Sequence, residues 1–213
     1  MEVEPIYAIA GAALALALTT GGTIAYFIVK AGRERQRELF EKFAHRLGAE
    51  IGTSLFEGVY LKGREDGIGY RIFIVAGNQY SPPNLRIEFG DRLPYILTIQ
   101  EKGLNSRLEN AVGFGRGETI ESGVEEMDEK FSIRTSDPER AKRYLTNPEV
   151  SGAFSRISRK APIRFRGDYA EIIIPLDSKK GSMQMVHASE NIDFDEVEYL
   201  LREGISLLGK MRE

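Results

Sequence analysis

The hydrophobic and polar positions of this chain divide it into an uncharged N-terminal run and a longer mixed segment. No charged residue lies within positions 5–29. At about 1.5 Å per helical residue the run reaches about 36 Å, against about 30 Å for the hydrocarbon core of a bilayer. The pattern predicts a transmembrane anchor over residues 1–31. The basic residues that follow the run are Lys30, Arg33, Arg35 and Arg37.

Charges on the two sides of the run give the orientation we expect. Glu2 and Glu4 precede it, and basic residues follow it. The positive-inside rule then predicts a single-pass protein of the cell (inner) membrane, with its N-terminus outside and its C-terminal domain in the cytoplasm. A cleaved secretory signal is the alternative, with a small-x-small site at residues 15–17. The acidic residues at the start of this chain and the length of its apolar run are atypical of such signals.

Small residues recur at every fourth position of the predicted anchor. They are Ala13, Ala17, Gly21 and Ala25. This spacing lets helix backbones approach closely in lipid, so we expect these residues to pack against another transmembrane helix, of a second copy or of another subunit. The alternative is chance, because Ala and Gly are common in membrane spans.

An amphipathic pattern follows at the start of the mixed segment. Its apolar residues have helical spacing and are Leu39, Phe40, Phe43, Ala44 and Leu47. This pattern predicts a juxtamembrane amphipathic helix within residues 32–50. The remaining residues, 51–213, suffice for one domain with a single core.

Short apolar runs separated by turn residues dominate the domain. The predicted strands are 55–61, 70–76, 85–89, 95–100, 131–135, 163–166 and 169–176, with further candidates at 118–122 and 183–188. Short links rich in Gly, Pro, Asn and Asp favour antiparallel pairing, because parallel strands need crossovers of about a dozen residues.

Capping signals predict two short helices. Ser136 and Glu139 have the spacing of a capping box before a helix over 138–145, and Asn147 precedes a helix over 148–158.

An apolar stripe predicts a last helix, from Phe194 to Met211. The predicted fold class is therefore α+β: an N-terminal transmembrane helix, then a mainly antiparallel sheet with helices packed on one face.

The segment over residues 131–148, FSIRTSDPERAKRYLTNP, carries a resemblance. With the layout around it, it is similar to uncharacterised prokaryotic membrane-anchored proteins that have an α+β domain of unknown function. The resemblance implies a domain type without a known activity, and it transfers no functional residue.

The composition of the chain gives little support for a catalytic or metal-binding role. The chain has no cysteine, which excludes disulfides, thiolate nucleophiles and zinc–thiolate sites, and its two histidines, His45 and His187, lie far apart. The glycine-rich stretch 113–117 lacks the strand, helix and Lys-Ser/Thr of a phosphate-binding loop. We predict no catalytic residue, no metal and no cofactor.

Charge is segregated within the predicted domain. Residues 134–166 hold nine Lys or Arg against three acids, whereas residues 118–129 hold six acids and no base. The two segments either neutralise each other or leave a basic surface for anionic lipid headgroups or an acidic protein. Nucleic acid is not expected, because no binding motif is present and the formal net charge is −3. The candidate contact residues are Lys30, Arg33, Arg35, Arg37, Arg159 and Lys160.

These observations predict a non-catalytic, membrane-anchored interaction module or accessory subunit of a larger membrane assembly. The expected partners are the lipid bilayer and other transmembrane helices. The alternative is a membrane-tethered enzyme or small-ligand-binding domain whose site cannot be recognised from sequence.

Overall fold

A computed structural model describes residues 30–54, 58–77, 82–90, 95–102, 117–166, 169–176 and 192–212. These residues form a nine-stranded sheet in the order β1-β2-β3-β4-β9-β8-β5-β7-β6, and every neighbouring pair of strands is antiparallel. The strands are β1 Glu50–Ser54, β2 Gly58–Glu65, β3 Ile68–Val75, β4 Asn84–Phe89, β5 Leu97–Glu101, β6 Glu118–Ile120, β7 Phe131–Thr135, β8 Ile163–Arg166 and β9 Tyr169–Pro175.

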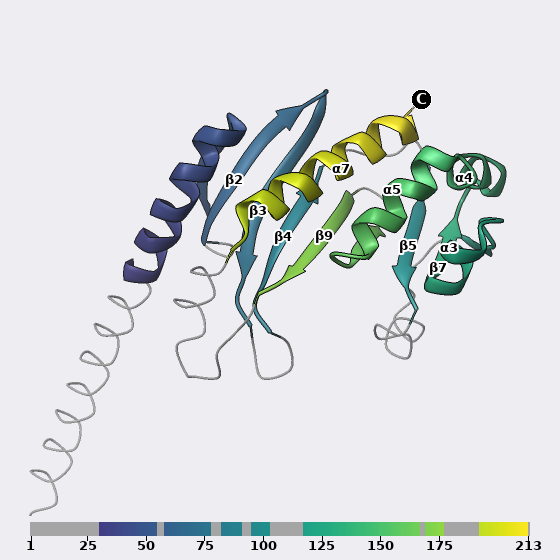
Figure 1. The fold of residues 1–213 in the computed structure, drawn as a ribbon, viewed down its shortest axis with the longest axis horizontal. Helices are drawn as coiled ribbons and strands as arrows, with labels where there is room; N and C mark the ends of the chain where they lie inside the picture. Colours follow the sequence, from purple (N-terminus) through teal and green to yellow (C-terminus); the bar gives the residue numbers. More distant parts are fainter. Residues whose placement is uncertain are drawn as a thin grey trace, which may run out of the picture.

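Helices form a second layer on one face of the sheet. Figure 1 shows α7 and α5 crossing the same face, with α3 beside β7. A helix over 30–47 joins this layer, because the rings of Phe43 and Phe194 lie 4.6 Å apart and Arg46 pairs with Asp195 of α7 at 2.7 Å. The labelled helices are α3 Glu125–Lys130, α4 Pro138–Leu145, α5 Pro148–Ser158 and α7 Phe194–Arg212.

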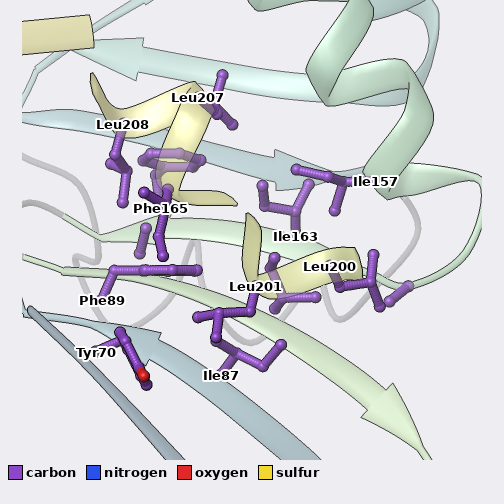
Figure 2. Packing of buried hydrophobic residues seen from close by; sticks show 14 of the residues in the cluster. Tyr70, Ile87, Phe89, Ile157, Ile163, Phe165, Leu200, Leu201, Leu207 and Leu208 are labelled. Atoms are coloured by element: carbon purple, nitrogen blue, oxygen red, sulfur yellow. The ribbon is translucent and has the colours of Figure 1, made fainter. Parts of the chain in front are cut away.

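Strand alternation decides which face the helices cover. In β4, Leu85, Ile87 and Phe89 are buried, whereas the residues between them are only half-buried. Alternate side chains point to opposite faces of a sheet, so the apolar set lies under the helices. Figure 2 shows this core, with Leu200, Leu201, Leu207 and Leu208 of α7 around Ile87, Phe89 and Phe165 of the sheet.

The sheet and its helix layer agree with the predicted α+β class, but the transmembrane helix in that prediction is corrected. No helix in the part of the chain that the structure describes is both long enough and apolar enough to cross a membrane. The described helical residues 30–47 carry charge along their length, from Lys30 to Arg46. Residues 1–29, which include most of the predicted anchor, lie outside the described residues.

Helices α4 and α5 have the predicted bounds, but the cap of α4 differs from the prediction. The Asp137 carboxylate, directly before the helix, accepts a hydrogen bond from the Arg140 amide at 3.1 Å. The Ser136 hydroxyl instead accepts from the Ile96 amide at 3.0 Å. Ser136 therefore connects the residue before β5 to the segment after β7 and does not cap the helix. In α5, the Asn147 side chain accepts from the Glu149 amide, as predicted for a cap.

The sheet order departs from a simple meander after β4. Strands β1 to β4 pair in chain order, but β4 next pairs with β9, and β5 lies between β8 and β7. Strand β1 and helix α3 were not predicted. Strand β1 has one large apolar residue, Ile51, and α3 has only Met127 buried, so neither carries a clear periodic signal. The candidate strand at 183–188 lies outside the described residues.

Candidate functional site

One face of the sheet has no described helix packed on it, and we call it the open face. Its charged side chains occupy strand positions that alternate with the buried ones. Among the described side chains, the cations of this face outnumber its acids. The cations are Lys62, Arg64, Arg71, Arg86, Arg134 and Arg164, and the acids are Glu50, Glu88 and Glu171.

Strand register aligns many of these charges in one row across the sheet. Each member lies directly opposite the next one, from β1 through β2, β3, β4 and β9 to β8. We call this set the charged row. In order, its members are Glu50, Lys62, Arg71, Glu88, Glu171 and Arg164.

Glu171 is the buried member of the charged row. Its side chain is 4% exposed, and its two carboxylate oxygens accept hydrogen bonds from Arg86 at 3.3 Å and Arg164 at 3.2 Å. Asn84 accepts from the Arg86 Nε at 3.1 Å and so fixes that guanidinium. A buried carboxylate is costly unless it is paired, and two cations also offset the like charge of Glu88 opposite it. The arrangement holds two arginines at the sheet centre.

Aromatic rings flank the charged row. The Arg71 guanidinium lies 4.8 Å from the ring centroid of Tyr60 and 5.7 Å from that of Phe73, within cation–π range. Tyr60 and Phe73 are directly opposite each other. A Cβ at Gly52 would collide with the Tyr60 ring, so glycine in β1 makes room for this ring. The cluster places a cation against aromatic surface on the open face.

An exposed ion pair ends the charged row at the sheet edge. Lys62 Nζ lies 2.9 Å from a Glu50 carboxylate oxygen. The hydrogen bond from Lys62 lowers the pKa of Glu50, and the same bond raises the pKa of Lys62. Both groups therefore stay charged over the physiological range.

Arg159 and Lys160, predicted as contact residues, lie in the helix layer. Arg159 lies 3.7 Å from Glu126 of α3, and Lys160 lies 3.4 Å from Glu196 of α7 and 5.1 Å from the Tyr199 ring. They are therefore on the opposite side of the sheet from the charged row.

The basic segment 134–166 divides between the two faces. Arg134 and Arg164 are on the open face, while Arg156 pairs with Glu203 of α7 at 2.8 Å. In the acidic segment 118–129, Glu126 pairs with Arg159 and with Lys130, and hydrogen bonds from Lys130 and Ser155 lower its pKa. Mutual neutralisation of the two segments is thus partial, because α7 and β9 also supply acids.

The basic residues after the uncharged run lie in the first turns of the helix over 30–47. Lys30, Arg35 and Arg37 are exposed, Arg33 is half-buried, and Arg37 pairs with Glu41 at 3.2 Å. His45 is exposed on the same helix.

Further sequence-predicted residues lie outside the described residues, so no helix-packing contact is described for them. They are Ala13, Ala17, Gly21, Ala25 and His187. Among the residues described, no three acidic or histidine side chains lie close enough to hold a metal ion.

A second polar cluster surrounds Tyr95. Its ring stacks on that of Tyr144 with centroids 6.1 Å apart, and the Arg140 guanidinium lies 5.3 Å from the Tyr95 centroid. The Tyr95 hydroxyl is buried and has no hydrogen-bond partner among the described residues. Burial, and then the neighbouring Tyr144, raise the pKa of Tyr95.

We expect Tyr95→Phe to raise the free energy of unfolding by about 1 kcal/mol, because it removes a buried hydroxyl that has no partner. The matched control is Tyr144→Phe, which removes a hydroxyl that interacts with Arg140 and should lower stability by a similar amount. Denaturant unfolding of the full chain in mild detergent measures both. A loss of stability in both variants would contradict the prediction.

Comparison with known proteins shows a likeness in the overall fold of the chain. No family model and no curated protein matches the chain. Among solved structures, the crystal structure of the mycobacterial trehalose monomycolate transport factor A matches with a TM-score of 0.50 and 12% identity, over 84% of this chain and 94% of that one. The two proteins share a fold. At this identity the likeness extends to the fold alone.

Proposed function

We propose that this chain is a non-catalytic accessory protein that works at a membrane surface in association with lipid. The observation that carries the proposal is the shared fold, which covers nearly the whole of a transport factor for trehalose monomycolate. An accessory factor acts by binding, and a broad sheet face that carries cations and aromatic rings suits such a role.

The basic residues at the start of the helix over 30–47 give the proposal independent support. They follow an uncharged run of the sequence, and three of the four are exposed. Cations in such a place favour an anionic leaflet by about 1 kcal/mol each. The domain would then be held beside the headgroups.

The test is purification of the full chain, tagged after Glu213, in mild detergent, followed by mass spectrometry of the proteins and lipids that accompany it. We expect at least one membrane protein and a lipid class enriched over an unrelated membrane protein with the same tag. Purified chain without a specific companion of either kind would contradict the accessory role. Turnover of a small molecule by the purified chain would contradict the non-catalytic assignment.

A further inference from the structure

We infer that the open face of the sheet docks on the headgroups of an anionic lipid bilayer. The inference rests on the proposed lipid-associated function and names its contact surface. That surface differs from the one that the sequence indicates, because Arg159 and Lys160 belong to the helix layer.

Charge distribution is the first step of the argument. The chain has a formal net charge of −3, yet on the open face the described cations outnumber the described acids. In the helix layer, by contrast, the α7 acids Glu196 and Glu203 are paired with Lys160 and Arg156. The excess of cations on the open face favours its approach to an anionic surface.

Preorganisation of the cations is the second step. The Glu171 carboxylate pairs with Arg86 and Arg164, and the rings of Tyr60 and Phe73 lie against Arg71. Arginine binds phosphate oxygens through a planar fork of donors, and guanidinium groups already fixed by neighbours lose less freedom on binding. A guanidinium carries five N–H donors, and Arg86 uses two of its nitrogens in the hydrogen bonds to Asn84 and Glu171.

The spread of the cations favours a bilayer over an acidic protein. Lys62 and Arg64 lie on β2, near one edge of the sheet, and Arg134 lies on β7, near the other. A bilayer presents phosphates over any area, whereas a protein site concentrates contacts in a central patch. Tyrosine beside the cations suits the headgroup level of a membrane, where rings that are apolar at one end and polar at the other accumulate.

Single cysteines test the inference, because the natural chain has none. Ser132 is exposed on the open face in β7, and Ser206 is exposed on α7. The full-length variants Ser132→Cys and Ser206→Cys, each labelled with a polarity-sensitive fluorophore, are reconstituted into vesicles of phosphatidylcholine with or without phosphatidylglycerol. We expect the probe at position 132 to respond only in anionic vesicles, with a response that salt weakens, and the probe at 206 to stay silent.

Charge reversal provides the matched control. Lys62→Glu with Arg64→Glu changes one lysine and one arginine on the open face, and Lys142→Glu with Arg143→Glu makes the same change in charge on α4. The first pair should reduce the response at position 132 to its level in neutral vesicles, whereas the second should leave it unchanged. An equal effect of both pairs would overturn the inference.

Other outcomes separate this inference from the proposed function. A silent probe at position 132 in anionic vesicles, while lipid still accompanies the purified chain, overturns the docking face and leaves the function standing. A response in native membranes but not in vesicles identifies a protein as the occupant and also overturns the inference.

Discussion

Replacement of Glu171 by Ala is expected to lower the free energy of unfolding by roughly 3 kcal/mol, because it leaves Arg86 and Arg164 half-buried without their shared carboxylate. Glu171→Gln should cost less, since an amide oxygen still accepts a hydrogen bond but no longer neutralises charge. Denaturant unfolding of the full chain in mild detergent measures both losses.

An exposed pair supplies the control for this prediction. Arg37 and Glu41 are paired on the helix over 30–47, with side chains 64% and 54% exposed. Glu41→Gln should change stability by less than about 0.5 kcal/mol, because surface pairs on a helix contribute little. If Glu171→Ala lowered the free energy of unfolding no more than Glu41→Gln, the Glu171 carboxylate would not stabilise Arg86 and Arg164 as described.

Substitution of a glycine in α7 should also lower the stability of the fold. A Cβ at Gly204 would collide with the ring of Phe89 on β4, and Phe89 is only 1% exposed, so the ring has no room to move away. We expect Gly204→Ala to lower the free energy of unfolding by about 1–3 kcal/mol through overpacking, even though alanine favours a helix.

Gly209, in the same helix, is the matched control. A Cβ there meets nothing within 4 Å, so Gly209→Ala should raise stability by up to about 1 kcal/mol through helix propensity alone. Opposite signs for the two substitutions are the expected result in thermal or denaturant unfolding. Stabilisation by both would show that α7 does not approach β4 as closely as described.

Much of the fold could be predicted from the sequence, because strong local patterns specify it. Helices α4 and α5 begin at prolines preceded by capping side chains. Strand β4 alternates apolar and polar residues, and β9 carries an apolar run. The cap at Asp137 was missed, since Ser136 offered the more familiar spacing to Glu139. Local signals of this kind locate elements but do not arrange them.

Strand order and the open face needed information that local patterns lack. The charged row joins Glu50 with Glu171, residues far apart in sequence that only the pairing of five strands brings into line. The charge count along the chain favoured the segment 134–166, yet folding sends its members to opposite sides of the sheet. Alternation within β2 and β4 was the available signal, because each places charged residues two positions apart between apolar or small ones.

The position of β9 beside β4 has a consequence for synthesis of the chain. Strands β1 to β4 can pair as soon as they leave the ribosome, but the free side of β4 has to wait for a strand encoded about 80 residues later. Until then β4 presents an unsatisfied backbone edge with buried-type side chains, which is the kind of surface that recruits other chains. Arrival of the β8–β9 hairpin closes that edge and joins β5, β7 and β6 to the earlier half in one step.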